Sequence, residues 1–484
     1  MSTNFFIDHI STGIEAVDSL IEGGFPRGSL ILLAGNPGTG KTVFGAKFLC
    51  KGVKDCDEAG IYVSFAENKE TFIHNITKHL GSDSRKYFEE GKCGFLDFVT
   101  VKEEGIPSVL KVILDEVREA KARRLVIDSF SAMSQAFEKQ IETRVILHTI
   151  LGKFLRELGC TTVLISEVPR GEERIGTGME EFVADGVITL KKKELDGRTL
   201  REIEILKMRG TRIDESRIPF TLHGGFEAFL PLQPKLPEKP RRFQPEPDSP
   251  NFFSSGIPQL DQIMGGGYPR GSTVLFELAE NVSDYEGFVF GLTQILNFIT
   301  QGNPVLVFPP IGIDASIVEQ TSVQNLISEE EVNRSLRMCV TESDYSGLAN
   351  FPFVQKYTTD SLPMNQEMFL SMVGKLTQNN RLPLLTVMGT DTLFSHFGEK
   401  ITELLNITIN MARAGNHLCL LLLKPGLPSP HTYHMLRATS RIYFKMIREH
   451  GVPLFYGIKP RTCLISVNLD ATKVYPFPKL TPII

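Results

Sequence analysis

The stretch LILLAGNPGTGKT, residues 30–42, decides the fold of the first half of the chain. Its apolar start predicts a buried strand, and its glycine-rich end, which opens a helical stretch, fits the GxxxxGKT phosphate-binding loop. The glycines let successive backbone N–H groups turn inward around phosphates, and the helix N-terminus behind them adds positive potential. We therefore predict a triphosphate site made of eight residues: Gly35, Asn36, Pro37, Gly38, Thr39, Gly40, Lys41 and Thr42.

Two residues of this loop and one further acid are expected to bind the phosphates and their metal ion. Lys41 should reach the β- and γ-phosphates, and the Thr42 hydroxyl should ligate Mg²⁺. The run RLVIDS, residues 124–129, predicts a strand that ends at Asp128, where a carboxylate can hold the same Mg²⁺ directly or through water. An Asp-Ser pair after a strand also suits a helix N-cap, but the loop upstream favours the metal role.

Three more side chains are candidates for chemistry. Glu67 follows a predicted strand, where it could orient the attacking water, although a solvated loop carboxylate is the alternative. Lys207 and Arg209 lie two positions apart after the alternating run 201–206, so they share one face of a predicted strand. Such a pair suits a clamp on a γ-phosphate, and two solvated strand charges are the plainer interpretation.

The chain contains a long internal repeat. TGIEAVDSLIEGGFPRGSLI, residues 12–31, is matched by SGIPQLDQIMGGGYPRGSTV, residues 255–274, at a separation of 243 positions. A duplication of this period indicates two copies of one domain, not a solenoid. Between the copies, the proline density of residues 231–250 favours an extended, semi-rigid spacer. The expected division is a first domain at residues 1–233, a proline-rich linker at 234–252 and a second domain at 253–484.

Both copies alternate short apolar runs with helical patterns. In the first copy, the apolar spacing predicts helices over residues 108–121 and 141–157. This alternation is typical of an α/β domain with a mostly parallel central sheet flanked by helices. The strands predicted in the first copy are Leu30–Ala34, Ile61–Phe65, Leu125–Ile127 and Thr162–Ile165.

Together these features resemble the KaiC branch of the RecA/RadA superfamily. The resemblance covers nearly the whole chain. It rests on the tandem layout, the entry motif TGI…LD…GG.P.GS, the phosphate loop, VIDS, and GMEEFVADGV at 178–187 followed by ILKMRGT at 205–211. It implies two tandem RecA-like P-loop domains that use ATP with Mg²⁺. It also implies a homo-oligomeric ring, usually hexameric, with nucleotides between neighbouring subunits.

The resemblance also assigns roles to individual residues. Lys207 and Arg209 match the Lys and Arg of the family's KxRGT element, which reach across to the neighbour's γ-phosphate. The family has two adjacent acids after its second strand, whereas the pair here reads Ala66-Glu67. Glu67 is then the sole expected base, and we expect hydrolysis to be slow.

The second copy departs from the phosphate-binding pattern. At the separation of 243 residues, Lys41 falls on Asp284 and Thr42 falls on Tyr285. An Asp in place of the lysine repels phosphate, and the loss of the glycines removes the backbone cradle. We therefore expect copy two to keep the fold without triphosphate chemistry.

The other site residues are also missing from the second copy. Glu67 falls on Pro310, and Asp128 falls roughly on Met388, with Asp391 nearby but out of register. A member of the family performs autokinase chemistry in its second domain, and we do not expect that chemistry here.

One element of the second copy is retained. Lys459 and Arg461, in YGIKPRTC, match Lys207 and Arg209 at a common separation of 252 positions. Either they have kept a role or they are relics on a strand, and without a partner in view the sequence favours relics.

Composition restricts the class of protein. With 42% hydrophobic and 23% charged residues, the chain should fold as a soluble globular protein. A net charge of −5 argues against a surface that coats nucleic acid. The seven cysteines show no CxxC spacing and suggest reduced packing residues. Since neither a secretory signal nor a membrane-spanning run is evident, we expect a cytoplasmic protein without membrane contact.

The leading hypothesis is an ATPase, converting ATP and water to ADP and phosphate, that acts as a nucleotide-gated switch in a ring. The degenerate domain would pass the change to an unidentified protein partner. One alternative is a RadA-like DNA-processing ATPase; its candidate loop, Pro169–Gly176, has two arginines nearly cancelled by two acids. Another is a non-enzymatic scaffold stabilised by ATP. A kinase acting on other proteins is not expected, because no substrate-binding signature stands out.

Overall fold

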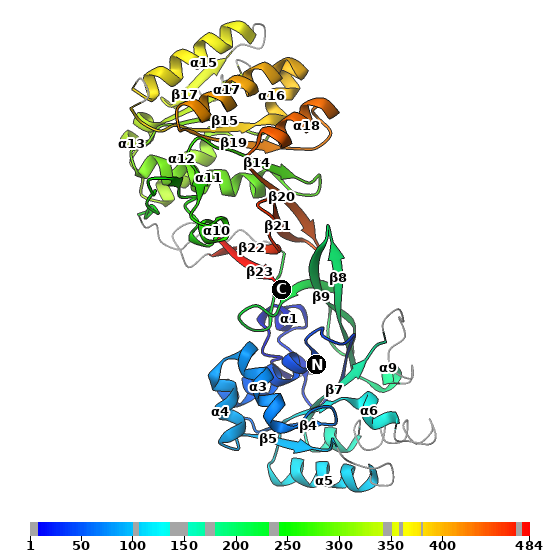
Figure 1. Cartoon of the computed structure of the whole chain (residues 1–484). Helices are drawn as coiled ribbons and strands as arrows, with labels where there is room; N and C mark the ends of the chain where they lie inside the picture. Colours follow the sequence, from blue (N-terminus) through cyan, green and yellow to red (C-terminus); the bar gives the residue numbers. More distant parts are fainter. Residues whose placement is uncertain are drawn as a thin grey trace, which may run out of the picture. The chain divides into compact units, whose positions relative to one another are not determined.

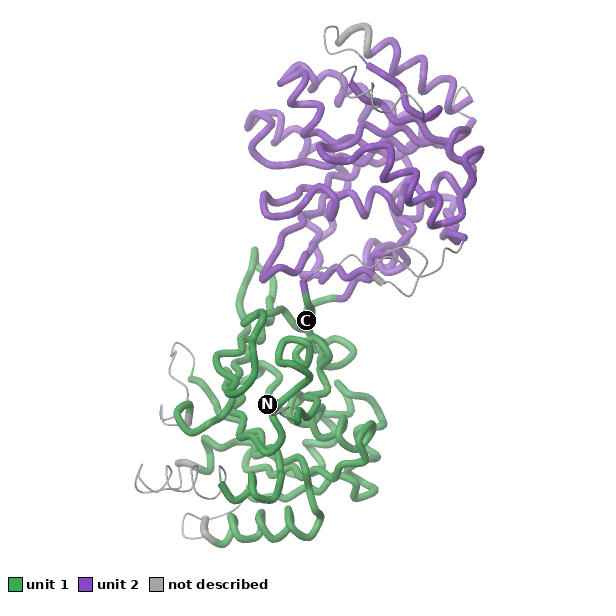
Figure 2. Tube along the Cα trace, turned by 180° about the vertical axis from the view of Figure 1, so that it is seen from behind, with its two compact units in different colours: residues 1–230, 482–484 green, residues 231–481 purple. Residues whose placement is uncertain are grey.

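The computed structural model divides the chain into two units (Figure 2). Unit 1 comprises residues 1–230 and 482–484, and unit 2 comprises residues 231–481. The residues that the structure describes are 8–99, 106–135, 153–169, 180–231, 242–341, 351–357, 362–378, 381–470 and 477–484.

Unit 1 is built on a nine-stranded sheet with the order β11-β10-β9-β8-β3-β7-β6-β4-β5. The strands from β8 to β5 in this order are parallel, and β9, β10 and β11 add antiparallel pairs at one edge. The strands are β3 (Leu30–Gly35), β4 (Gly60–Ser64), β5 (Cys93–Asp97), β6 (Arg124–Asp128), β7 (Thr161–Glu167), β8 (Gly186–Leu195), β9 (Arg198–Met208), β10 (Arg217–Thr221) and β11 (Glu227–Ala228).

Helices cover both faces of this sheet (Figure 1), because its central strands are apolar on both sides. One face packs against α1 (Glu15–Leu20), α2 (Lys41–Lys51), α3 (Lys69–Leu80) and α4 (Ser82–Glu89). The other packs against α5 (Ile106–Glu119), α6 (Phe130–Gln135), α8 (Leu155–Glu157) and α9 (Glu180–Val183). The α/β class predicted from the sequence is confirmed.

Unit 2 repeats this arrangement in a ten-stranded sheet, with the order β17-β16-β15-β18-β19-β14-β20-β21-β22-β23. Its strands from β17 to β20 are parallel, and β21 begins the antiparallel edge. The strands are β14 (Thr273–Leu278), β15 (Val305–Phe308), β16 (Leu336–Thr341), β17 (Val354–Tyr357), β18 (Leu385–Gly389), β19 (Leu418–Leu423), β20 (Ile442–Glu449), β21 (Val452–Lys459), β22 (Leu464–Asp470) and β23 (Phe477–Ile483).

The helices of unit 2 also form two layers. On one face lie α10 (Pro258–Met264), α11 (Asp284–Thr300), α12 (Ala315–Gln324) and α13 (Glu329–Ser335). On the other lie α15 (Leu362–Leu376), α16 (Thr390–Phe397), α17 (Ile401–Ala414) and α18 (Pro430–Thr439). α11 follows β14 as α2 follows β3, so the two units place corresponding elements in corresponding positions.

The repeat seen in the sequence extends to individual hydrogen bonds. In unit 1, Asp18 accepts from Ser11 Oγ at 2.5 Å and from the N–H of Thr12 at 2.7 Å. In unit 2, Asp261 accepts from Ser254 Oγ at 2.5 Å and from the N–H of Ser255 at 2.8 Å. The Asp of the entry motif, Asp18 in unit 1 and Asp261 in unit 2, therefore fixes the turn before the first helix of each unit.

Residues 242–250, within the segment expected to be a spacer, pack on unit 2. Phe243 is buried in the core of that unit and its N–H donates to the carbonyl of Asn325. Arg242 forms an ion pair with Glu331.

All seven cysteines are free. No helix among the described residues is both long enough and apolar enough to cross a membrane.

Candidate active site

The phosphate loop joins the carboxyl end of β3 to α2. Gly38 and Gly40 have φ angles of +77° and +102°, a region that favours glycine, so the chain can curl tightly here. Lys41 opens α2, and its Nζ donates to the carbonyl oxygens of Gly35 at 2.9 Å and Asn36 at 3.0 Å. The loop thus ends at a helix N-terminus, whose backbone N–H groups lack intrahelical partners and suit an anion.

Lys41 is buried, with 7% of its surface exposed. Burial lowers the pKa of its ammonium group, and the negative charges of Glu167 and Asp128 act in the opposite direction. Glu167 is the last residue of β7 and pairs with Gly35 on the neighbouring strand β3. The cation expected to meet phosphate is therefore balanced by carboxylates from two other strands.

Asp128 ends β6 and accepts two hydroxyl hydrogen bonds. Thr42 Oγ1 donates to Asp128 Oδ2 at 2.8 Å, and the Tyr62 hydroxyl donates to the same oxygen at 2.5 Å. Tyr62 is fully buried on β4, and burial together with the Asp128 charge raises the pKa of its phenol well above the ordinary value. Tyr62 therefore stays a donor. The Asp128 carboxylate and Thr42 hydroxyl fit the hard oxygen ligands that Mg²⁺ prefers.

Glu67 lies half-buried in the turn between β4 and α3. Ser64 Oγ donates to the carbonyl of Glu67 at 2.6 Å and accepts from its N–H at 3.1 Å, which fixes the turn. The Glu67 carboxylate accepts a hydrogen bond from Asn75 Nδ2 at 3.0 Å. Burial raises the pKa of Glu67 and Asp128 adds to the rise, while the Asn75 bond opposes it. This carboxylate is suited to take a proton from water.

Lys207 and Arg209 lie toward the opposite end of the sheet. Lys207 pairs with Val187, which pairs in turn with Leu32 near the start of β3, whereas the phosphate loop follows the other end of that strand. Arg209 continues further in the same direction. Because strand residues rise about 3.3 Å each, the fold does not bring these two cations to the phosphate loop of their own chain.

Both cations are held by the segment that enters β8. Lys207 Nζ donates to the carbonyl oxygens of Glu181 at 2.9 Å and Ala184 at 2.7 Å. Burial, and then the positive charge of Arg209, lower the pKa of Lys207. Arg209 forms an ion pair with Asp185 at 3.5 Å. These contacts orient the two side chains at the surface.

Four residues near the site were not predicted. Tyr62 and Glu167 contact it because their strands neighbour β6 and β3, an adjacency that no local motif encodes. Asp185 lies within the quoted run GMEEFVADGV, which was the available signal. Arg201 on β9 donates through Nη1 to the carbonyl of Gly38 at 3.1 Å and through Nε to the carbonyl of Ile484 at 2.8 Å.

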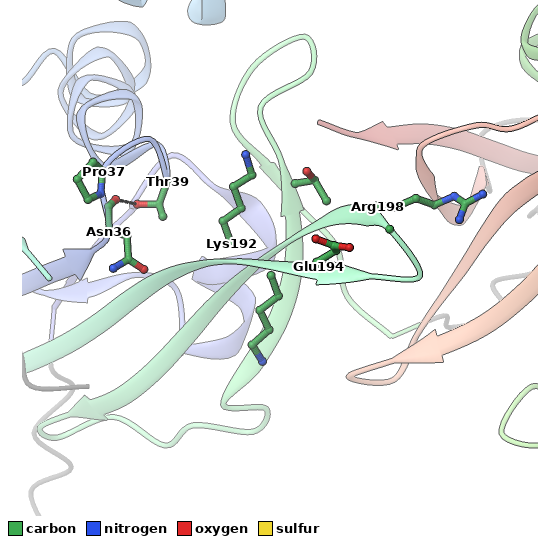
Figure 3. Close-up of a pocket in the computed structure, with 9 residues that line it drawn as sticks. Asn36, Pro37, Thr39, Lys192, Glu194 and Arg198 are labelled. Atoms are coloured by element: carbon green, nitrogen blue, oxygen red, sulfur yellow. Dashed lines mark hydrogen bonds between the residues drawn. The ribbon is translucent and has the colours of Figure 1, made fainter. Parts of the chain in front are cut away.

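A pocket of about 480 Å³ lies beside the phosphate loop (Figure 3). Asn36, Pro37 and Thr39 form its loop side. The β8–β9 hairpin forms the other side, including Lys192 and Arg198. The outer side of the phosphate loop therefore borders a pocket lined by both cationic and acidic side chains, including Lys192 and Glu194.

The strand registers identify the counterparts of these residues in unit 2. Asp284, the first residue of α11, is the counterpart of Lys41, the first residue of α2. Because β14 pairs with β19 as β3 pairs with β7, Lys424 is the counterpart of Glu167. Lys424 Nζ lies 2.9 Å from Asp284 Oδ1. The cation and the anion have exchanged places between the two units.

The expected counterpart of Asp128 is corrected by one position. Gly389 pairs with Leu422 as Asp128 pairs with Ile165, so Gly389, not Met388, corresponds to Asp128. A Cβ atom on Gly389 would lie 2.3 Å from the Pro310 Cα, so a side chain does not fit there. Unit 2 has no room for a metal-binding carboxylate at this position.

The expected counterpart of Glu67 is corrected by two positions. β15 starts two residues later than the separation of 243 implies, so Gly312, not Pro310, corresponds to Glu67. The nearby Asp391 is buried, and its Oδ2 accepts from the N–H of Ile311 at 3.0 Å. Burial raises the pKa of Asp391. Asp391 thus serves the packing of the 309–312 turn.

Two predicted segments cannot be compared with the structure. Within the candidate DNA-binding loop, residues 170–176 lie outside the described residues, and so do residues 141–152 of a predicted helix.

Known families match the two halves of the chain separately. The ATPase model described as KaiC matches residues 10–226. The model described as GvpD basic region 2 matches residues 242–484, which is half of the chain.

Curated relatives match the first half. The circadian clock oscillator protein KaiC of Parasynechococcus marenigrum is 32% identical over 284 residues, covering 57% of this chain and 53% of the relative. The same protein of Synechococcus elongatus is 32% identical over 279 residues, covering 56% and 52%. The circadian clock protein KaiC2 of Synechocystis is 30% identical over 274 residues, covering 54% and 46%. The chain spans about half the length of these relatives.

A solved structure is also similar. The crystal structure of a KaiC-like protein from the archaeon Pyrococcus horikoshii has 36% sequence identity and a TM-score of 0.42. The match covers 46% of this chain and all of the other.

Proposed function

The chain belongs to the family described as GvpD basic region 2 and carries a KaiC-type ATPase domain, and from this premise we propose that unit 1 hydrolyses ATP as a nucleotide-gated switch. Unit 2 acts as a partner domain without triphosphate chemistry. The observation that carries the proposal is that Lys41 and Thr42, which follow β3, lie at the same end of the parallel sheet as Asp128 of β6 and Glu67 after β4.

Each of these side chains has a chemical task. The backbone N–H groups of the loop and the Lys41 ammonium bind the β- and γ-phosphates. Thr42 and Asp128 hold Mg²⁺, which neutralises developing charge on the phosphates when bound. Glu67 accepts a proton from the attacking water. Tyr62 keeps Asp128 oriented through its buried hydrogen bond.

Lys207 and Arg209 complete the site in a neighbouring subunit. Their position at the far end of the sheet supports a head-to-tail assembly, in which this end of one copy meets the phosphate loop of the next. Such heterologous contacts close into a ring when the rotation allows it. ATP then lies between copies, and its hydrolysis changes the contact that the partner protein reads.

The decisive experiment measures ATP turnover and molecular mass together, using light scattering with and without ATP and Mg²⁺. Wild type should turn over ATP and gain mass when ATP is added, whereas Lys41→Ala should show neither turnover nor an ATP-dependent gain in mass. Lys78→Ala, an exposed lysine on α3, is the matched control and should behave as wild type. Equal turnover in wild type and Lys41→Ala would refute the proposal.

A further inference from the structure

Unit 2 retains the cationic element that the proposed ATPase uses between subunits. A β-bulge interrupts the pairing of β8 with β9 next to Val187, and a bulge interrupts that of β20 with β21 next to Tyr443. Val187 pairs with Lys207, and Tyr443 pairs with Lys459. The two lysines therefore occupy the same position in the two sheets.

The retention extends to how the lysine is held. Lys207 Nζ donates to the carbonyl of Glu181 at 2.9 Å, and Lys459 Nζ donates to the carbonyl of Arg437 at 2.7 Å. Glu181 and Arg437 themselves correspond in the registers of β8 and β20. Lys459 and Arg461 are both exposed. Unit 2 thus keeps the strand position and one backbone contact of the lysine, together with both residue types.

A phosphate is not the target of this pair. Lys459 lies at the end of the unit 2 sheet that is remote from α11, so it does not reach the Asp284 end of its own chain. In a second copy, the place of the phosphate lysine is taken by Asp284, and Gly389 leaves no room for a metal ligand. The retained cations would therefore meet a surface that repels phosphate.

That surface instead presents one carboxylate beside a set of paired charges. Glu280, the counterpart of Pro37 in the phosphate loop, is exposed and forms no ion pair with any residue that the structure describes. Asp284 is partly exposed beside it and shares its charge with Lys424. Ile311 and Leu427 follow the carboxyl ends of β15 and β19, at the same end of the sheet, and expose 53% and 46% of their surfaces. Two carboxylates with flanking apolar side chains suit a protein interface.

We propose that Lys459 and Arg461 of one copy bind Glu280 and Asp284 in unit 2 of a second copy, where carboxylates replace the nucleotide phosphate. The inference rests on the head-to-tail assembly proposed above. Unit 2 then associates without nucleotide, while contacts between unit 1 copies depend on ATP. Because the paired charges are partly exposed, salt screens the contact.

The test measures the mass of the full chain by light scattering after nucleotide has been removed with apyrase. Wild type should be an oligomer at low salt and should approach the monomer mass of 54.0 kDa in 1 M salt. Glu280→Lys should be monomeric, and so should the double variant Lys459→Glu/Arg461→Glu. Glu319→Lys, an exposed acid on α12, is the matched control and should assemble as wild type.

Mixing the two charge-reversed proteins provides the sharper result. In an assembly where the two variants alternate, one kind of interface joins the lysine introduced by Glu280→Lys to the acids introduced by Lys459→Glu/Arg461→Glu. The other kind of interface joins the unchanged residues, as in wild type. The mixture should therefore recover the oligomer that neither variant forms alone, and recovery also shows that both variants are folded. The inference fails if nucleotide-free wild type is a monomer, if Glu280→Lys still assembles, or if the mixture stays monomeric.

These outcomes are separable from those of the proposed function. If wild type turns over ATP and assembles only with ATP, the ATPase proposal stands and the unit 2 contact is refuted. If nucleotide-free assembly depends on Glu280 while Lys41→Ala keeps full turnover, the unit 2 contact stands and the ATPase site is refuted.

Discussion

Asp284 and Lys424 form an ion pair of 2.9 Å at the positions that Lys41 and Glu167 occupy in unit 1. The charge pair has been inverted, so the place that receives phosphate in unit 1 presents a carboxylate in unit 2. A bound phosphate would have to break this pair and would meet negative charge.

Reintroducing the lysine alone should not restore nucleotide binding. In Asp284→Lys, two cations face each other, and the loop from residue 279 to 283 still lacks glycines that could form a cradle. In a Lys41→Ala background, fluorescent ATP analogues should remain unbound. The change should also destabilise unit 2 by about 1–2 kcal/mol, between the values for exposed and buried pairs. Tight binding by this double variant would contradict the account.

Gly389→Ala should destabilise unit 2 by about 1–3 kcal/mol, because its Cβ atom would meet the backbone of Pro310. The midpoint of urea unfolding, followed by circular dichroism, measures the effect. Gly291→Ala on α11 is the control: its Cβ atom would find only ordinary contacts, and helix propensity predicts a gain of up to about 1 kcal/mol. Equal effects at the two positions would count against steric exclusion at Gly389.

The pH dependence of turnover should report Glu67. A base must be deprotonated to act, and burial raises the pKa of Glu67 above its ordinary value of 4.5. Turnover should therefore fall as the pH drops through a value above 4.5. Asn75→Ala removes a bond that favours the carboxylate, so the acid limb of kcat/KM should move up by roughly one pH unit. Lys78→Ala, on the same helix, should leave the limb in place.

Tyr62→Phe should raise the Mg²⁺ concentration needed for half-maximal turnover about tenfold. The hydroxyl bonds to the charged oxygen of Asp128, and such bonds contribute roughly 1.5–3 kcal/mol. Nucleotide affinity measured without Mg²⁺ should be unchanged, since Tyr62 acts through the metal-binding carboxylate. A loss of ATP affinity in the absence of metal would indicate that the substitution disturbs the loop itself.

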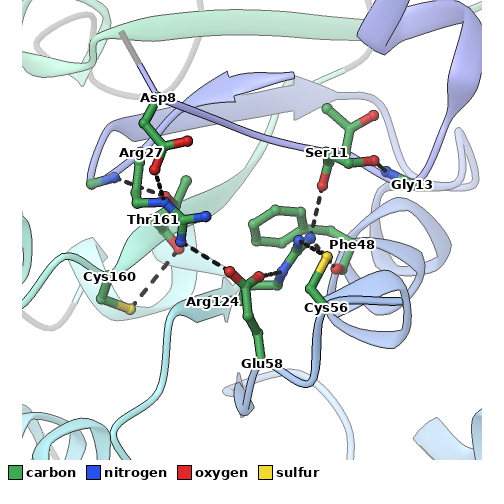
Figure 4. A network of polar contacts seen from close by, with 12 residues as sticks. Asp8, Ser11, Gly13, Arg27, Phe48, Cys56, Glu58, Arg124, Cys160 and Thr161 are labelled. Atoms are coloured by element: carbon green, nitrogen blue, oxygen red, sulfur yellow. Dashed lines mark hydrogen bonds and ion pairs between the residues drawn. The ribbon is translucent and has the colours of Figure 1, made fainter. Parts of the chain in front are cut away.

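Arg124→Ala should destabilise unit 1 by about 3–5 kcal/mol (Figure 4). Arg124 is fully buried, donates to Glu58 at 2.8 Å and to the carbonyls of Ser11 and Phe48, and its loss leaves Glu58 without this partner. Arg27→Ala is the control, because Arg27 also pairs with Glu58 but is partly exposed and should cost about 1 kcal/mol or less. Calorimetry of both variants provides the comparison, and similar losses would argue against the buried network.

Local patterns predicted much of unit 1. The strand expected at Leu30–Ala34 is β3, and those expected at Ile61–Phe65 and Thr162–Ile165 match β4 and β7 to within two residues. These strands are buried on both faces, so continuous apolar runs mark them. The phosphate loop continues from the end of β3 and Asp128 ends β6, so both could be placed from the sequence.

The remaining features depend on contacts between distant segments. Glu167 lies beside Lys41 only because β7 neighbours β3, and Tyr62 reaches Asp128 only across β4 and β6. The fixed separation of 243 gave the wrong counterpart at Pro310, and a rough motif match gave Met388, because the segments between strands differ in length between the units. Strand pairing supplied the correct register. The roles of Lys207 and Arg209 remain predictions that an assembled state must test.

The close contact between Gly389 and Pro310 has a consequence for the history of the protein. An Asp at position 389 requires the neighbouring turn to move first, and a Lys at position 284 faces Lys424 until that residue also changes. Each single step back toward a phosphate site therefore passes through a less stable protein. Selection acting on one substitution at a time therefore does not readily restore the phosphate site of the second copy, and further change in that copy favours other functions.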